Sequence, residues 1–258
     1  MAGYIGQLGR MVKLLWPTPV KVTNPTRYAV QSAPARLWAF VASPASARRR
    51  EWSLEVTGTN AETAELTQLV AGAFGDGPWV FVSDEATVTN VLTPAESMLS
   101  GVANSGAVDG VGGAGARSRS GGVPITIAEA CPCIPGEPVT VTVDMAGASG
   151  VLTVQPVNSA GQPVGAAVTA RPAGELMERV SVVIPALPLG ACAVKIQTRD
   201  STTVTRPQVT WTDGPVPWDM GAGAASVIIE EAQTTYTSYE FHMREMWRTL
   251  SLTIREVG

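Results

Sequence analysis

The sequence predicts a mainly β protein in which an antiparallel β-sandwich is inserted into a second β domain that contains one helix. Gly and Pro supply 26 and 19 of the 258 residues, a share that favours turns over long helices. Short Val- and Thr-rich runs follow one another from residue 124 to residue 211, which is typical of sandwiches. Residues 247–256 then repeat the alternation of an early strand.

The N-terminal part begins with few signs of regular structure. The first 35 residues include four prolines, and we expect an irregular arm that packs on something else, such as another subunit. The apolar run at residues 37–41 predicts a buried strand. Trp52, Leu54 and Val56 alternate with polar residues, which predicts a second strand that is buried on one face only.

Residues 61–74 carry the strongest helix prediction. Thr59 or Asn60 can cap this helix. The acidic residues in its first turns are stabilised by the positive end of the helix dipole. Gly and Pro at residues 75–78 end it, and the apolar run 79–82 follows as a strand. The apolar residues of the helix fall on one face: Leu66, Leu69, Val70 and Phe74.

The region from residue 124 onward predicts only strands. Inward Val or Ile residues alternate with outward Thr, Ser or Lys, and Gly, Pro, Asn or Asp residues mark the turns between the runs. The preceding stretch 100–123 holds eight glycines and is either a linker or a set of loops and weak strands of the same β domain. The expected strands are 125–127, 139–143, 151–154, 180–184, 193–196 and 204–211.

The C-terminal residues return to the pattern of the first domain. Leu250, Leu252 and Ile254 alternate with polar residues in the style of the strand around Trp52, and not in the style of the Val- and Thr-rich runs between them. We therefore expect the last strand to pair with the first domain. This predicts a discontinuous domain of residues 1–88 and 222–258, with a sandwich of residues 89–221 inserted into it.

The composition and motifs of the chain argue against several classes of function. The net charge of −4 argues against nucleic-acid binding, which needs clustered Lys and Arg. The chain has a single histidine, His242, and neither a Gly-rich phosphate loop, a G-x-S-x-G motif nor a His and Cys zinc spacing. We therefore expect no enzyme activity, no catalytic residue, no metal and no cofactor. We also expect no membrane span and no secretion signal.

The chain contains three cysteines, so they cannot all pair with one another. The Cys131-Pro-Cys133 spacing is one residue short of a C-x-x-C redox motif. We expect small buried thiols, and the alternative is a disulfide between Cys192 and one of the other two.

Aromatic and acidic residues cluster in one stretch, Trp211 to Asp219. A sugar site needs aromatic faces for stacking and polar groups for the hydroxyls. Trp211, Asp213, Trp218 and Asp219 are therefore candidate ligands for a carbohydrate, with Gln208 and Tyr236 as further candidates. In the alternative interpretation, Trp211 packs in the core and Trp218 fills a seam between the domains.

Two short motifs bracket the middle of the chain. Asn90-Val91-Leu92-Thr93-Pro94 opens it, and Thr205-Arg206-Pro207-Gln208-Val209 closes it. They resemble the first and last strands of jelly-roll carbohydrate-binding modules. The resemblance implies a jelly-roll-like module that starts near residue 89 and includes the Gly-rich stretch. Val102 stands where that family carries a tryptophan.

The layout of residues 37–258 resembles the distal tail proteins of long-tailed phages of actinobacteria. That family combines a belt-type β domain with an inserted sandwich. Membership implies a virion protein, made in the host cytoplasm, that forms a ring, expected to be a hexamer, between the tail tube and the baseplate or tip. The implied partners are copies of itself, the tail tube and other tail-tip proteins, with a host cell-wall glycan as a further one. The alternative function is adhesion to the host surface through carbohydrate binding.

Overall fold

The computed structural model describes residues 3–14, 21–23, 28–32, 38–42, 49–100, 106–108, 116–119, 124–200, 202–240 and 245–257. The fold is mainly β with antiparallel sheets, which confirms the predicted class. Internal contacts divide the chain into two units. The sandwich unit comprises Gly3–Met11 and Val80–Ala225, and the platform unit comprises Val12–Trp79 and the chain from Ser226 onward. The sandwich unit thus includes residues 3–11, 80–88 and 222–225, which lie outside the predicted range 89–221.

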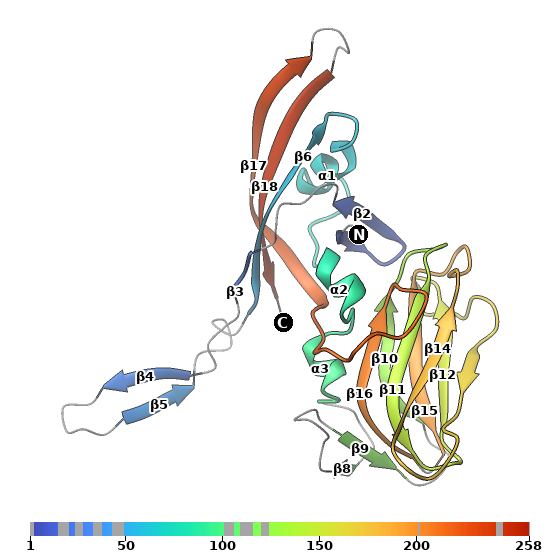
Figure 1. Cartoon of the computed structure of the whole chain (residues 1–258). Helices are drawn as coiled ribbons and strands as arrows, with labels where there is room; N and C mark the ends of the chain where they lie inside the picture. The colour runs from blue at the N-terminus through green and yellow to red at the C-terminus, as the bar shows by residue number, and fades with distance from the viewer. Residues whose placement is uncertain are drawn as a thin grey trace. The chain divides into compact units, whose positions relative to one another are not determined.

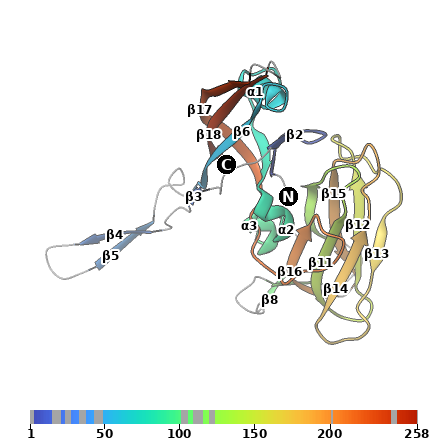
Figure 2. The ribbon, with the colours of Figure 1, turned by 45° about the horizontal axis from the view of Figure 1, so that its top comes forward.

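The sandwich unit contains two antiparallel sheets, which Figures 1 and 2 show packed face to face. All six strands predicted between residues 125 and 211 are present, and the short strand β13 was not predicted. One sheet has the order β10 (Ile125–Pro132), β15 (Ala193–Arg199), β12 (Val151–Val157) and β13 (Val168–Ala170). The other has the order β14 (Glu178–Ile184), β11 (Val139–Ala146), β16 (Thr202–Thr210), β9 (Ala116–Arg119) and β8 (Gly106–Val108).

Strands β8 and β9 settle the two interpretations of the Gly-rich stretch. Val204 of β16 pairs with residue 117 of β9, and β9 in turn pairs with β8. The described parts of residues 100–123 therefore add strands to the sandwich, and the linker interpretation is wrong for them.

Strand β11 lies in the middle of its sheet and is buried on both faces. Val139, Val141 and Val143 point into the core between the sheets and have no exposed surface. The alternate residues Thr142 and Asp144 lie on the outer face of the same sheet, and at most 2% of either is exposed. Polar side chains of neighbouring strands must therefore cover this outer face.

Two short helices precede the sandwich strands, and neither was predicted. Helix α2 (Asp84–Val88) begins where the Ser83 hydroxyl accepts the N–H of Ala86. Helix α3 (Pro94–Ser97) begins with a capping box, in which Thr93 and Glu96 satisfy each other's backbone N–H groups.

The N-terminal arm is not irregular, which corrects the prediction. Strands β1 (Gly3–Gln7) and β2 (Arg10–Leu14) are joined by a turn in which Gly9 has a φ of +85°. Tyr4 of β1 pairs with Val82 of β7 (Trp79–Val82). Three more strands follow in the described residues up to position 42: β3 (Lys21–Thr23), β4 (Tyr28–Ser32) and β5 (Trp38–Ala42). The four prolines of this part fall between the strands in the sequence and not within them.

The platform unit is built on the pairing of the last strand with an early one. Strand β18 (Glu245–Glu256) lies between β17 (Ala224–Glu240) and β6 (Glu51–Thr59), and β3 pairs with the start of β6. Figure 1 shows this arrangement. Leu250, Leu252 and Ile254 stand opposite Val56, Leu54 and Trp52, and all six side chains are buried. The pairing expected from their shared alternation is therefore confirmed.

The predicted helix exists but is shorter, because α1 covers only Ala64–Val70. Leu66 and Leu69 are its buried residues. Thr59 bonds reciprocally with Glu62 in the turn before the helix, with backbone N–H groups donating to each side chain. Arg248 of β18 donates to the Thr63 hydroxyl at 2.5 Å, which fixes the start of α1 to the sheet.

An ion pair between Arg50 and Glu256 connects the start of β6 to the end of β18. Arg50 donates from Nε and Nη2 to the Glu256 carboxylate at 3.0 and 2.9 Å, and its guanidinium lies 4.9 Å from the centroid of the Trp52 ring. Burial by itself would raise the pKa of Glu256, but the hydrogen bonds and charge of Arg50 outweigh it. The pKa of Glu256 therefore lies below its ordinary value.

This pair gives a stability contribution that depends on pH. Because the pKa of Glu256 is lower in the folded than in the unfolded chain, its contribution is complete above the unfolded value and is lost as pH falls through the folded value. At pH 7 we expect Glu256→Gln to lower the free energy of unfolding by about 1–2 kcal/mol. In urea titrations this difference should shrink steadily below about pH 4.5. Asp76→Asn, at an exposed turn, is the control; an equal loss at all pH values would contradict the prediction.

Candidate functional site

The first predicted sugar ligand, Trp211, lies in the core. It is 5% exposed, and its indole Nε1 donates to the Pro132 carbonyl at 3.3 Å. Its ring meets Tyr4 edge to face, with the centroids 5.3 Å apart. Because neighbouring side chains cover its faces, Trp211 is not placed to stack on a ligand.

Trp218 is placed differently, in the loop that follows β16. Its side chain is half-buried, and its Nε1 donates to the Pro207 carbonyl at 3.3 Å. Asp213 and Asp219 are exposed in the same loop, and Asp219 Oδ1 accepts the N–H of Met220 at 2.7 Å. Tyr236 is 63% exposed but lies on β17 in the platform unit. Of the predicted residues, the structure therefore groups Trp218 and Asp219.

The asparagine of the opening motif anchors this loop. Asn90 has no exposed surface, and its Nδ2 donates to the carbonyls of Pro207 and Asp219 at 3.2 and 2.8 Å. Its Oδ1 accepts the N–H groups of Leu92 and Val209. All the hydrogen-bonding groups of the amide are occupied, so the role of Asn90 is to hold the Trp218 loop against β16.

The glutamine of the closing motif has the same kind of role. Gln208 is 1% exposed, and its Nε2 donates to the carbonyls of Thr89 and Pro217 at 2.6 and 2.9 Å. Its Oε1 accepts from the Thr142 hydroxyl and from Arg179 Nη2. Gln208 is therefore a scaffold residue and does not offer its amide to a ligand.

An arginine–aspartate–arginine cluster lies on the outer face of the five-stranded sheet. The Asp144 side chain is 2% exposed. Arg179 Nη1 donates to its Oδ1 at 3.0 Å, and Arg206 Nε donates to its Oδ2 at 2.5 Å. Arg206 Nη2 forms a further ion pair with the same oxygen. We call these three residues the Asp144 cluster.

Arg179 connects the cluster to the scaffold residues. Its Nη1 donates to the Arg206 carbonyl at 2.7 Å, and its Nη2 donates to the Thr142 hydroxyl and to Gln208 Oε1. Burial lowers the pKa of Arg179, and the hydrogen bond and charge of Asp144 oppose that shift. The guanidinium stays charged, because its ordinary pKa lies far above neutrality.

Arg206 reaches the cluster through an irregularity in β16. Its φ is +49°, in the left-handed region, and the register between β11 and β16 shifts at this point. Such a bulge redirects a side chain that regular alternation would place elsewhere. Alternation along the sequence therefore does not predict Arg206 as a residue of this cluster. A signal for the cluster does exist, since Asp144 interrupts a run of Val and Thr residues.

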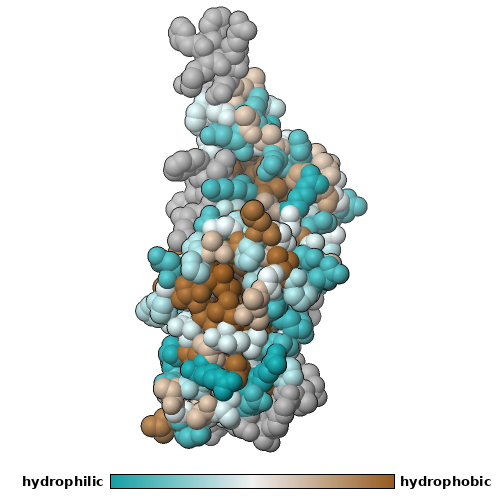
Figure 3. Space-filling view, turned by 90° about the vertical axis from the view of Figure 1, so that its right-hand side faces the viewer, coloured by the Kyte–Doolittle hydropathy of each residue, from teal (hydrophilic) through white to brown (hydrophobic). Residues whose placement is uncertain are grey.

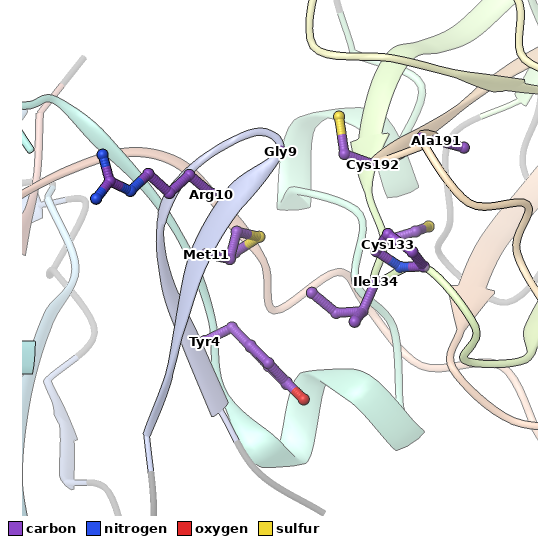
Figure 4. Close-up of a pocket in the computed structure, with 10 residues that line it drawn as sticks. Tyr4, Gly9, Arg10, Met11, Cys133, Ile134, Ala191 and Cys192 are labelled. Atoms are coloured by element: carbon purple, nitrogen blue, oxygen red, sulfur yellow. The ribbon is translucent and has the colours of Figure 1, made fainter. Parts of the chain in front are cut away.

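A separate pocket of about 390 Å³ lies at one end of the sandwich unit (Figure 4). The β1–β2 hairpin contributes Tyr4 and Met11, and Ile134 and Cys192 line the other side. Burial, and then the charge of Glu137, raises the pKa of the Tyr4 phenol. The walls of this pocket are mainly apolar.

The three cysteines are free and buried, so the expected buried thiols are confirmed and the disulfide alternative is wrong. Burial raises the pKa of Cys131, Cys133 and Cys192, which keeps these thiols protonated near neutrality.

Within the described residues, no group of three or more His, Cys, Asp or Glu is arranged to hold a metal ion. In that same part of the chain, no helix is long and apolar enough to cross a membrane. His242 lies outside the described residues.

The side of the sandwich that lies to the right in Figure 1 faces the viewer in Figure 3, where apolar and hydrophilic residues form separate patches.

No protein-family model and no curated protein matches this chain. Among solved structures it is similar to the CBM22-1–GH10 modules of Clostridium thermocellum endo-1,4-beta-D-xylanase 10B with xylohexaose, at 14% identity over 45% of this chain and 26% of that one, TM-score 0.33. The enzymatically active domain of bacteriophage CBA120 tailspike protein 4 matches at 12% identity over 76% and 19%, TM-score 0.30. CsCBM6-3 of Clostridium stercorarium with cellobiose matches at 17% over 43% and 84%, TM-score 0.30. These scores are too low to carry a functional inference.

Proposed function

We propose that this chain is a structural protein of a phage tail tip whose platform unit joins copies of the chain into a ring. One observation carries the proposal. Residues 231–236 of β17 are all exposed, although they pair with β18 along one edge. A strand normally buries at least one of its faces, so this segment has the character of a surface that another chain covers.

The register shows what such a neighbour would meet. Ala232, Thr234 and Tyr236 stand opposite Leu252, Leu250 and Arg248 of β18, which are buried. The face of the sheet that is buried over β18 is thus open to solvent over residues 232–236 of β17. A second copy that docks there would continue the buried face. Repetition of one heterologous contact closes a ring when the rotation allows it, and the family resemblance implies six copies.

A second segment supports the same proposal. In the described part of the chain, β4 and β5 form a sheet of only two strands, with Val30 opposite Phe40. A two-stranded sheet is at best marginally stable in water, so a partner chain would stabilise this one. The tail tube and other tail-tip proteins are the proposed further partners, and the virion tail tip is the proposed location.

A charged residue on the exposed strip tests the assembly. We expect Tyr236→Glu to weaken self-association by at least about tenfold, because it replaces an exposed aromatic side chain by a carboxylate that the proposed contact would bury. Leu176→Glu is the matched control, since Leu176 is 84% exposed on the sandwich unit and should be neutral. Sedimentation velocity over a concentration series measures both. Equal association constants for the two variants would contradict the proposal for this strip.

A second function, carbohydrate binding by the sandwich unit, is favoured by the placement of Trp218. Its half-buried ring is fixed by the bond to Pro207, and it lies in a loop held by Asn90 and Gln208. A fixed aromatic ring beside polar groups is what stacking on a sugar requires. A host cell-wall glycan is the proposed ligand.

Trp218 substitutions test this second function. We expect Trp218→Ala to weaken binding on a glycan array by about tenfold or more, and Trp218→Phe to retain part of the affinity. Leu176→Ala removes an exposed apolar side chain of the same unit and should leave glycan binding unchanged. Binding that survives Trp218→Ala would exclude Trp218 as the stacking residue.

A further inference from the structure

The Asp144 cluster carries a surplus of positive charge. It holds two guanidinium groups and one carboxylate, a formal balance of +1. The Asp144 side chain is 2% exposed, whereas those of Arg179 and Arg206 are 28% and 34% exposed. Solvent therefore meets the two cations, and the anion lies beneath them.

The structural needs of Asp144 do not explain why Arg206 is present. Arg179 alone supplies a counter-charge, and it also bonds Thr142 and Gln208. Within the described residues, the Arg206 side chain bonds only Asp144, and its backbone is left-handed, which costs a non-glycine residue about 1–2 kcal/mol. Strained residues of this kind concentrate at binding sites, which makes Arg206 the residue to test.

Trp218 converges on the same point of β16. The Pro207 carbonyl accepts the Trp218 indole, and the preceding carbonyl, that of Arg206, accepts Arg179 Nη1. The carbonyls of this dipeptide therefore hold the Trp218 indole and the Arg179 guanidinium, and its first residue, Arg206, supplies the second guanidinium. Two carboxylates lie next to these residues in the sequence. Glu178, which precedes Arg179, accepts the N–H of Ala173, and Asp219, which follows Trp218, accepts the N–H of Met220.

We propose that the Asp144 cluster and Trp218 bind a saccharide that carries an anionic group, either a carboxylate on a sugar ring or a phosphate between polyol units. The sugar or polyol stacks on Trp218, and the anion bonds the outward N–H groups of Arg206, which suit planar and tetrahedral anions. This inference rests on the carbohydrate-binding function proposed for Trp218.

Calorimetry on the full chain at low salt separates the possibilities. The probes are tetragalacturonate for the carboxylate, poly(glycerol phosphate) for the phosphate, and neutral cellotetraose. We expect one anionic probe to bind at least about tenfold more tightly than cellotetraose, which corresponds to one charged hydrogen-bonding pair. Added salt should reduce this preference.

Variants assign the preference to the cluster. Arg206→Gln should abolish the preference for the anionic probe, whereas Arg206→Lys, which keeps the charge, should retain part of it. Arg171→Gln removes an exposed arginine of the same unit and should change nothing. Circular dichroism checks that each variant is folded. In every variant Arg179 is unchanged and can still pair with the Asp144 carboxylate.

The outcomes distinguish the anionic-ligand inference from the carbohydrate-binding function on which it rests. If cellotetraose binds as tightly as the anionic probes, or if folded Arg206→Gln keeps the preference, the anionic ligand is wrong and carbohydrate binding stands. If Arg206→Gln does not fold, a weakened preference in Arg206→Lys supports the inference and an unchanged preference overturns it. If none of the three probes binds, both proposals fall.

Discussion

Replacing Gly223 by alanine is expected to lower the free energy of unfolding of the sandwich unit by about 3 kcal/mol or more. A Cβ atom at Gly223 would overlap the Val91 carbonyl oxygen and lie 2.9 Å from the Val91 carbonyl carbon. Gly223 also donates its N–H to the Leu92 carbonyl at 3.0 Å, so the two backbone segments cannot separate without losing that bond. The neighbouring Gly221 has the same constraint, because a Cβ atom there would overlap the Leu92 carbonyl oxygen.

Gly174→Ala is the matched control for Gly223→Ala. A Cβ atom at Gly174 has no neighbour within 4 Å, so its replacement should change stability by no more than about 0.5 kcal/mol. Urea unfolding followed by tryptophan fluorescence measures both variants. A Gly223→Ala protein within about 1 kcal/mol of the parent, roughly the mean effect of a point mutation, would show that the close approach of residues 90–93 and 221–223 does not determine stability.

Asp144→Ala is expected to have the second large effect, a loss of about 2–4 kcal/mol. It removes the one carboxylate that faces Arg179 and Arg206 in the cluster, and leaves two partly buried guanidinium groups to repel each other. The partial exposure of both arginines keeps the effect below that of a fully buried pair.

The Asp144 prediction has an internal control and a rescue. Glu129 pairs with Lys195 on the same unit but is 70% exposed, so Glu129→Ala should cost less than about 0.5 kcal/mol. Adding Arg206→Gln to Asp144→Ala should recover part of the lost stability, because it removes one of the unpaired charges. Equal losses for Asp144→Ala and Glu129→Ala would contradict the account of the cluster.

Much of the fold could be predicted because alternation with a period of two is a local signal. Val139, Val141 and Val143 indicate β11, and Leu250, Leu252 and Ile254 indicate the strand that pairs with β6. The helices α2 and α3 were missed although Thr93, Pro94 and Glu96 form a capping box that the sequence displays. They contain only five and four residues, too few for periodicity to show.

The candidate site could be predicted only in part, because it depends on contacts between strands far apart in sequence. Trp211 and Trp218 look equivalent in the sequence, yet one packs against Tyr4 and the other is half-exposed. The Asp144 cluster joins β11, β14 and β16. The bulge that directs Arg206 to it is a property of strand pairing that side-chain alternation does not reveal.

Electron microscopy of the purified full chain tests the central claim most directly, namely that the sheet in which β18 pairs with β6 belongs to a platform unit that joins copies of this protein. We predict closed rings, of six copies if the family resemblance holds, and their loss in Tyr236→Glu. Single, unassociated particles at every concentration of the parent protein would contradict the account.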